Sequence, residues 1–252
     1  MSKNVLILGG TSEGVALAHA LAEHRPDLHV TIALAGATRA PSEMPGHVRI
    51  GNFGGAEGLK DFLITHGIAA VIDATHPFAR HITQNAVEAC ADAGVPRLYF
   101  ERPPWILPQD TDVVYVPDMD EAARLAARTS GSAFLTVGRK GLNAFEQVRD
   151  VNLLVRLIEE PEQPLKLENC TVVTGRPPFD ENAEEMLMRE HQIDTLVSKA
   201  SGGAATRAKI DAAANVGARI VLIRRPPPPD GERTSSIEET LGWLYTHVAK
   251  ED

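Results

Sequence analysis

The chain has 252 residues, of which 43% are hydrophobic and 23% are charged, and its formal net charge at pH 7 is −9. This length is enough for one large domain or two modest ones, and the composition is that of a soluble globular protein. The negative charge argues against nucleic acid as a partner, because nothing supplies a broad basic face. We find no secretory leader and no apolar run of about 20 residues, so we expect a cytoplasmic protein without a membrane partner. The sequence leaves the oligomeric state open, and we favour a monomer. Two isolated cysteines, Cys90 and Cys170, offer neither a metal site nor a disulfide framework.

The chain opens with a strand, a glycine-rich turn and a helix. Residues 4–8 form a short apolar run typical of a buried parallel strand, and the apolar spacing from Val15 to Leu21 suits a helix packed on it. The turn resembles the dinucleotide fingerprint Gly-x-Gly-x-x-Gly, with a threonine at the middle glycine. Backbone N–H groups and the helix dipole make such a turn a phosphate site, and the threonine hydroxyl can add a bond. We therefore predict cofactor binding by Gly9, Gly10, Thr11, Ser12, Glu13 and Gly14, the alternative being an ordinary glycine-rich turn.

Strands and helices alternate through the rest of the first half. The pattern predicts strands at residues 29–34, 48–50, 69–73 and 97–100, and helices at 56–66 and 77–93. Pro77 suits the first turn of the second of these helices, and Gly94 ends it. The proline-rich passage 103–108 follows and predicts a hinge.

The same alternation resumes after the hinge. We predict strands at 113–116, 133–137, 153–158, 171–173, 195–198 and 219–223, and helices at 120–128, 182–191 and 206–216. Four prolines begin an extended linker at 226–231, and the capping-box spacing of Ser235 with Glu238 begins a final helix at 235–248. This rhythm predicts an α/β protein of two Rossmann-like lobes, residues 1–104 and 105–252. Each is a mainly parallel sheet flanked by helices, with a cleft between the two.

Ligands of open parallel sheets bind beyond the carboxyl ends of the strands, so the residues that follow each strand are informative. After the strand 29–34, an NAD site would place an acidic residue to bond the ribose 2′-hydroxyl. This chain instead has Thr38 and Arg39, which suit a 2′-phosphate and favour NADP over NAD. A solvated loop charge is the alternative for Arg39.

The strand 69–73 ends in a polar cluster at the start of a helix. Asp73, Thr75 and His76 are placed to face a ligand, and Arg80 lies on the first helical turn, where its charge can meet a substrate carboxylate. In the alternative interpretation, Thr75 or His76 caps the helix and Asp73 bonds loop backbone.

Two turns that join a cation to glycine follow strands in the second half. The turn 138–141 contains Lys140, and the turn 198–203 contains Lys199 between hydroxyl groups. Such turns suit phosphates or carboxylates. The second turn leads into a helix that carries Arg207 and Lys209, and we expect Lys209 to be solvated.

Several familiar chemistries are excluded by motifs that the sequence lacks. There is no Gly-x-x-x-x-Gly-Lys-Ser/Thr phosphate loop and no Gly-x-Ser-x-Gly elbow, and no tyrosine has a lysine four positions on. No general acid stands out. This pattern favours a hydride transfer in which a nicotinamide supplies the chemistry and the protein orients it.

Three segments together resemble the precorrin-6A reductase (precorrin-6x reductase) family of cobalamin biosynthesis. They are Ile7-Leu8-Gly9-Gly10-Thr11-Ser12-Glu13-Gly14, Asp73-Ala74-Thr75-His76-Pro77-Phe78-Ala79 and Ser198-Lys199-Ala200-Ser201-Gly202-Gly203, and the similarity spans nearly the whole chain. One departure is that this chain has Pro177-Pro178-Phe179 where the family often has Gly-Pro-Phe.

The resemblance implies NADPH-dependent reduction of one double bond in precorrin-6A, a carboxylate-rich tetrapyrrole, to precorrin-6B. It implies that the glycine turn and Thr75 hold the cofactor and that the cleft holds the macrocycle. His76 is the leading proton donor to the ring, with solvent as the alternative source. We expect the substrate to contact Asp73, Pro77, Phe78, Arg80, Arg102, Lys140, Ser198, Lys199, Ser201, Gly202 and Arg207.

Other functions remain open at this point. The chain can be an NADP-dependent reductase of another acidic small molecule or of the cobalt-containing analogue. It can also be a non-catalytic NADP-sensing protein, although a sensor has no need of the second set of basic glycine turns.

Overall fold

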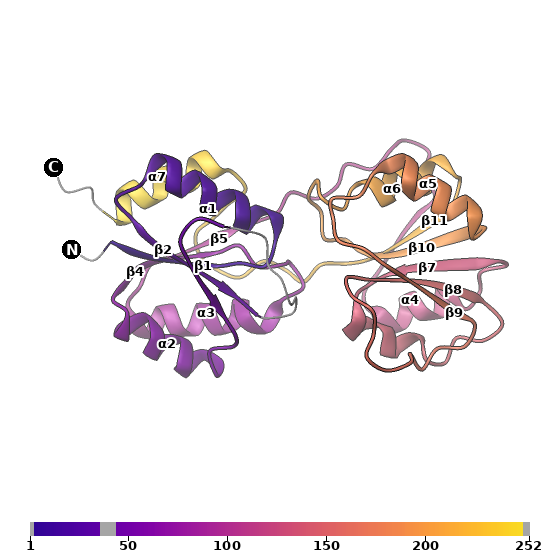
Figure 1. The fold of residues 1–252 in the computed structure, drawn as a ribbon, viewed down its shortest axis with the longest axis horizontal. Helices are drawn as coiled ribbons and strands as arrows, with labels where there is room; N and C mark the ends of the chain where they lie inside the picture. Colours follow the sequence, from indigo (N-terminus) through magenta and orange to yellow (C-terminus); the bar gives the residue numbers. More distant parts are fainter. Residues whose placement is uncertain (1–2, 36–43, 249–252) are drawn as a thin grey trace. The chain divides into compact units, whose positions relative to one another are not determined.

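The computed structural model describes residues 3–35 and 44–248, which fold as two compact units. Unit 1 comprises Met1–Pro103 together with Pro226–Asp252, and unit 2 comprises Pro104–Arg225. Each unit has one six-stranded parallel sheet with helices on both faces (Figure 1). The α/β fold of two parallel sheets is therefore confirmed. Among the described residues, no helix is long and apolar enough to cross a membrane.

The sheet of unit 1 has the strand order of dinucleotide-binding folds, 3-2-1-4-5-6, in which the sixth strand comes from the end of the chain. All five neighbouring pairs are parallel. From one edge to the other the strands are β3 (His47–Ile50), β2 (His29–Leu34), β1 (Asn4–Leu8), β4 (Ile68–Asp73), β5 (Arg97–Phe100) and β12 (Arg233–Thr234).

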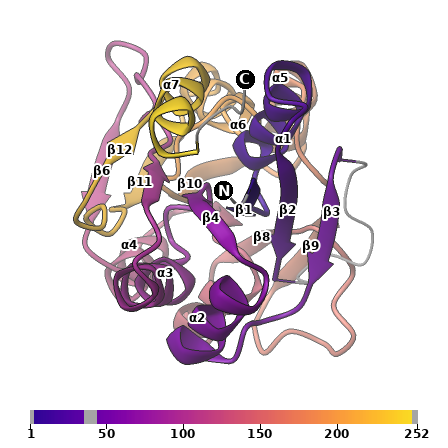
Figure 2. The same ribbon diagram turned by 90° about the vertical axis from the view of Figure 1, so that its left-hand side faces the viewer.

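Two pairs of helices cover this sheet. Helices α1 (Ser12–His24) and α7 (Ile237–His247) lie on one face, and α2 (Gly55–Thr65) and α3 (Arg80–Ala93) lie on the other (Figures 1 and 2). The central strand β1 supplies both layers of the core: Val5 and Ile7 pack with α1 and α7, and Leu6 and Leu8 pack with α2 and α3. An apolar run without alternation is what burial on both faces requires.

The end of the chain corrects our domain assignment, which placed residues 105–252 in one lobe. Strand β12 pairs with β5, and Glu101 N donates to Thr234 O at 2.7 Å. In α7, Leu244 is fully buried in the cluster that contains β1 and α1. The prolines of the linker thus carry the chain back to unit 1. The sequence shows an amphipathic helix and a linker, but neither pattern states which sheet the helix will cover.

Unit 2 repeats the layered architecture with a different strand order. Its strands are β6 (Val113–Val116), β11 (Arg219–Ile223), β10 (Ile193–Lys199), β7 (Ser132–Thr136), β8 (Asn152–Leu157) and β9 (Cys170–Thr174), in that spatial order. Helices α5 (Glu181–Glu190) and α6 (Ala208–Asn215) cover one face (Figure 1). Helix α4 (Met119–Ala126) and the 3₁₀ helix η1 (Arg139–Phe145) lie together on the other face (Figure 1).

Three local expectations were wrong at helix starts. Helix α3 begins at Arg80 and not at Pro77, which lies in a turn before it. The basic turn 138–141 continues into the helix η1. The cap of α7 is Ser236, whose hydroxyl accepts from Glu239 N at 3.4 Å, and so lies one residue beyond the predicted Ser235.

Candidate active site

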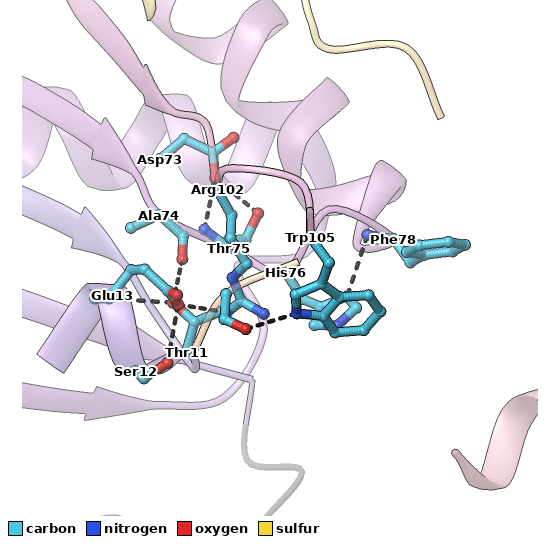
Figure 3. A network of polar contacts seen from close by, with 12 residues as sticks. Thr11, Ser12, Glu13, Asp73, Ala74, Thr75, His76, Phe78, Arg102 and Trp105 are labelled. Carbon is cyan, nitrogen blue, oxygen red and sulfur yellow. Dashed lines mark hydrogen bonds and ion pairs between the residues drawn. The ribbon is translucent and has the colours of Figure 1, made fainter. Parts of the chain in front are cut away.

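The order of the strands in unit 1 creates a ligand site at the carboxyl ends of β1 and β4. These two strands are neighbours, with Leu8 paired to Asp73, but the chain leaves them toward opposite edges of the sheet. A parallel sheet opens a crevice at such a switch point. The glycine turn after Leu8 and the polar segment after Asp73 therefore lie side by side (Figure 3).

The first and last glycines of the turn lie where a side chain would be crowded by its neighbours. A Cβ atom on Gly9 would lie 3.1 Å from Ile32 Cγ2, and one on Gly14 would lie 3.3 Å from Gly9 Cα. Gly10 has φ of +100°, a conformation that other residues rarely adopt. The spacing therefore produces a tight turn in which backbone atoms approach one another closely, as a dinucleotide cradle needs.

Thr11 performs a structural task that differs from the expected one. It is the N-cap of α1, where its Oγ1 accepts from Gly14 N at 3.1 Å and donates to Ala74 O at 2.7 Å (Figure 3). The one hydroxyl proton is thus used within the protein, so the expected hydroxyl donation to a phosphate is not available in this arrangement. Of the backbone N–H groups in the first turn of α1, that of Gly14 is used by this cap, and those of Ser12 and Glu13 are left for an anion.

Glu13 and Arg102 form an ion pair, although we had assigned them to different ligands. The Arg102 side chain is 9% exposed, and Glu13 Oε2 also accepts from Ser12 Oγ at 3.0 Å (Figure 3). The pair joins the first turn of α1 to the segment that follows β5. Arg102 is therefore engaged by the protein and is not the unpaired cation that a substrate contact would suggest.

Asp73 is fully buried and shapes the turn after β4. Its Oδ1 accepts from Thr75 N at 3.2 Å and from Thr75 Oγ1 at 2.7 Å, and Thr75 Oγ1 lies 3.1 Å from Thr83 Oγ1. Burial raises the pKa of Asp73, and the bonds from Thr75 oppose this shift. The expected substrate contact by Asp73 is wrong, since no part of its side chain reaches the surface. The alternative interpretation, a bond to loop backbone, is what the structure shows.

His76 has a defined hydrogen bond that fixes its tautomer. Phe78 N donates to His76 Nδ1 at 3.2 Å (Figure 3). In a neutral imidazole the proton is then on Nε2, which becomes a donor. The ring is half-buried, and it lies 5.8 Å from the ring of Phe78 between centroids.

The start of α3 carries positive charge without compensation. Its cap, Ala79, provides no side-chain bond, and the first turn has no acidic residue. Arg80 is exposed there, and in the described part of the chain it has no ion-pair partner. A cation at this end of a helix is electrostatically unfavourable unless an anion is nearby. Pro77 and Phe78 are half-buried in the preceding turn, and Arg39 lies outside the described residues.

In unit 2, cations lie at the carboxyl ends of three adjacent strands of the sheet. Strand β11 is followed by Arg224 and Arg225, β10 ends at Lys199, and β7 is followed by Lys140 after one more cation, Arg139. Burial, and secondarily the charge of Lys140, lowers the pKa of Lys199. The two lysines predicted to bind substrate are therefore close enough to influence each other.

Other predicted residues of unit 2 are less available. Ser198 is fully buried, with its Oγ donating to Lys199 O at 3.3 Å, and Ser201 is 5% exposed. Neither hydroxyl is presented to solvent. Gly202 has φ of +69° and supports the turn through its backbone. Arg207 is paired with Asp211 at 2.7 Å, a contact that raises the pKa of the guanidinium.

Lys209 was expected to be solvated, and this expectation is wrong. It is 7% exposed, and its Nζ donates to Thr136 Oγ1 at 3.1 Å. Burial lowers its pKa to about 7, and the charge of Arg156 adds to the effect. Helix α6 begins at Ala208, and Lys209 is one of its buried residues, together with Ile210, Ala212 and Ala213.

Sequence reasoning missed Arg224, Arg225 and Tyr115, although it gave Trp105 as an apolar candidate to line a pocket, with core packing as the default. Both arginines line a cavity of about 280 Å³ together with Trp105 and Tyr115. The strand 219–223 was predicted correctly, and applying the strand-end rule to it would have identified the two arginines. The four prolines that directly follow Arg225 indicate an extended linker, and the two arginines were therefore interpreted as its beginning.

Comparison with known proteins decides the family. The family model described as "Precorrin-6x reductase CbiJ/CobK" matches residues 4–245. The chain belongs to the precorrin-6x reductase family. Membership of this reductase family makes the protein an oxidoreductase, and it confirms the resemblance drawn from the three sequence motifs.

Individual members of the precorrin-6x reductase family align along the full chain. The chain is 41% identical over 243 residues to "Precorrin-6A reductase" of Rhodococcus erythropolis, covering 96% of this chain and 97% of that one. It is 30% identical over 255 residues to "Cobalt-precorrin-6A reductase" of Priestia megaterium, covering 97% and 99%. The solved structure "CobK precorrin-6A reductase" superposes with a TM-score of 0.92 at 39% identity, covering 99% of this chain and 98% of that one.

Proposed function

We propose that this protein uses NADPH to reduce one double bond of precorrin-6A, giving precorrin-6B in cobalamin biosynthesis. The observation that carries the proposal is a dinucleotide-type switch point, with its crowded glycine turn, in a chain of the precorrin-6x reductase family. The relatives named precorrin-6A reductase reach 41% identity, compared with 30% for the cobalt-precorrin-6A reductase of Priestia megaterium. This difference favours the cobalt-free macrocycle.

The residues of unit 1 fit a nicotinamide dinucleotide. A Cβ at Gly9 or Gly14 would crowd the close turn, and the backbone N–H groups of Ser12 and Glu13 at the start of α1 are available for the pyrophosphate. The residues Gly9, Gly10, Thr11, Ser12, Glu13 and Gly14 would hold the pyrophosphate, with Thr75 beside them and Arg39 on the 2′-phosphate. When bound, the nicotinamide supplies the hydride.

The chain's own contribution to the chemistry lies in orientation and in placing a proton. Because Nδ1 of His76 accepts from Phe78 N, Nε2 holds the proton of the neutral ring. A donor at Nε2 can stabilise negative charge that develops on a ring nitrogen of the substrate and can pass a proton toward it. Phe78 fixes the ring through this bond, and the Asp73–Thr75 contacts fix the turn that carries both residues.

The cations of unit 2 support an acidic substrate. Lys140, Lys199 and Arg224 follow three neighbouring strands at one edge, in a protein whose formal net charge is −9. Carboxylates pair best with such cations where solvent is partly excluded, as at Lys199. Arg80 at the start of α3 adds a further cation in unit 1.

The decisive experiment is anaerobic NADPH oxidation with purified precorrin-6A, in parallel with NADH and with cobalt-precorrin-6A. We expect NADPH to be consumed with a matching change in the absorption of the macrocycle. Arg39→Ala should reduce the preference for NADPH over NADH by about 1.5–3 kcal/mol, the range for a hydrogen bond to a charged group. Turnover of only the cobalt form would contradict the assigned substrate, and binding of neither nucleotide would contradict the cofactor site.

A further inference from the structure

Unit 2 contains a small cavity that combines aromatic rings with guanidinium groups. Its volume is about 280 Å³, and it is lined by Pro104, Trp105, Tyr115, Ala200, Leu222, Arg224 and Arg225. All of these residues belong to unit 2. Pockets that enclose a whole drug-sized ligand span roughly 300–1,000 Å³, so this cavity suits one ring and its substituent better than a complete macrocycle.

Trp105 gives the cavity a rigid aromatic wall. Its Nε1 donates to Gly203 O at 2.7 Å, and Lys209 Nζ lies 5.7 Å from the ring centroid. The indole is thus held by its polar edge and by the buried amine of Lys209 against the ring. A side chain that is already fixed loses little conformational entropy when a ligand packs on it. Tyr115, which is 45% exposed, provides a second ring.

The two arginines differ in how the protein holds them. Arg225 Nε donates to Ala200 O at 3.1 Å, which ties it to the turn after β10. Arg224 is exposed, and its Cζ lies 5.6 Å from the centroid of Tyr115. Within residues 3–35 and 44–248, no carboxylate forms an ion pair with Arg224. A guanidinium beside an aromatic cavity, without an acidic partner in an acidic protein, is arranged to receive an anion from outside.

We propose that this cavity, the Trp105 pocket, binds one pyrrole-type ring of the substrate together with its carboxylate arm. The ring packs on Trp105 and Tyr115, and the carboxylate pairs with Arg224. The inference rests on the proposed function for the identity of the whole ligand. The recognised group itself, a planar conjugated ring with a short acid arm, follows from the residues of the pocket.

Binding of the isolated group can be measured without turnover. The chain has two tryptophans, so Trp243→Phe leaves Trp105 as the only one. Porphobilinogen, a pyrrole with one acetate and one propionate arm, serves as the probe, and the emission of Trp105 as the readout. We expect saturable binding that weakens about tenfold or more in Arg224→Gln, because a charge-assisted hydrogen bond is lost.

A matched control removes the same charge at a distant position. Arg128 is exposed between α4 and β7, before the amino end of β7, whereas Arg224 follows the carboxyl end of β11. Arg128 has no ion-pair partner among the described residues. Arg128→Gln should bind the probe as the parent does. If wild-type affinity for the probe is absent, or if Arg224→Gln and Arg128→Gln behave alike, the Trp105 pocket is not this site.

A kinetic measurement separates this inference from the proposed function. With NADPH in excess, Arg224→Gln should raise KM for precorrin-6A about tenfold and leave the dissociation constant of NADPH unchanged, whereas Arg128→Gln should change neither. Normal turnover with an unaltered KM in Arg224→Gln would overturn the pocket and leave the reductase intact. Absence of turnover in the wild type would overturn the reductase, while the probe titration would still report on the pocket.

Discussion

Single residues at the switch point of unit 1 connect the two halves of the site. The Thr11 hydroxyl bonds Gly14 N on one side and Ala74 O on the other, so the glycine turn and the end of β4 are held together by one atom. Sequence reasoning placed Thr11 in the right location but gave its hydroxyl the wrong partner. A motif shows that a donor is present, whereas the acceptor is supplied by a residue 63 positions away.

His76 permits a direct test at the same scale. His76→Ala removes the Nε2 donor, and we expect kcat with precorrin-6A to fall about 100-fold or more, the range for a lost general acid. The dissociation constant of NADPH should remain unchanged, because the glycine turn is untouched. Single-turnover rates measured between pH 6 and 9 would check this, and a variant with normal rates throughout would show that the proton comes from solvent. His19→Ala removes an exposed imidazole of α1 that no predicted contact involves, and as the matched control it should retain the rate.

Lys209 predicts a pH dependence of stability. Its pKa is about 7 in the folded protein against 10.5 for an ordinary lysine, so between these values the unfolded chain binds more protons. The free energy of unfolding should therefore rise with pH across this window, by at most about 1.4 kcal/mol per pH unit, relative to Lys209→Met. The stabilisation is fully present above the unfolded pKa and is lost as the pH falls through the folded one. Urea denaturation of both proteins at several pH values measures it, and parallel curves would contradict the burial of this amine.

At the scale of whole elements, the return of the chain to unit 1 has a measurable energetic consequence. Leu244 of α7 is fully buried against α1 and β1, so Leu244→Ala should lower the free energy of unfolding of unit 1 by about 2–5 kcal/mol. In a Trp105→Phe background, Trp243 emission follows this unit. Thr246→Ala, an exposed position of the same helix, should have little effect. In the reciprocal Trp243→Phe background Trp105 reports on unit 2, and a destabilisation confined to that unit would instead favour the original assignment of α7.

Elements with a strong local pattern were predictable, and their long-range partners were not. The apolar run of β1 and the strand 219–223 were predicted well because burial on both faces leaves a continuous signal. The start of α3 was predicted three residues too early, at Pro77, because proline also suits the turn that His76 and Phe78 stabilise. The burial of Lys209 was not predicted, because a short helix has too few residues to show from sequence which of its sides faces the sheet.

At the scale of the whole molecule, an acidic protein presents local rows of cations. The repulsion of its net charge, −9, and the attraction of these rows act on the same anionic substrate. Raising the ionic strength from about 0.1 M to 1 M shortens the Debye length from about 10 Å to about 3 Å. We expect KM for precorrin-6A, at saturating NADPH, to rise several-fold over this range while kcat changes little.

The rise of KM with ionic strength should be smaller in Lys140→Gln, which removes one exposed cation from those at the strand ends of unit 2. Arg128→Gln again provides the charge-matched control and should follow the wild type. An equal salt dependence in all three proteins would mean that the row does not attract the substrate.

The two crossings of the chain, after Pro103 and after Arg225, set an order of assembly during synthesis. Every residue of unit 2 is translated before the linker prolines, whereas unit 1 is incomplete until β12 and α7 have been made. Until then, β5 is an open edge strand, and the apolar side of α1 lacks its second helix. Unit 1, whose synthesis begins first, is thus completed last. A premature stop codon before β12 would leave unit 2 whole and would deprive the N-terminal unit of one strand and one helix.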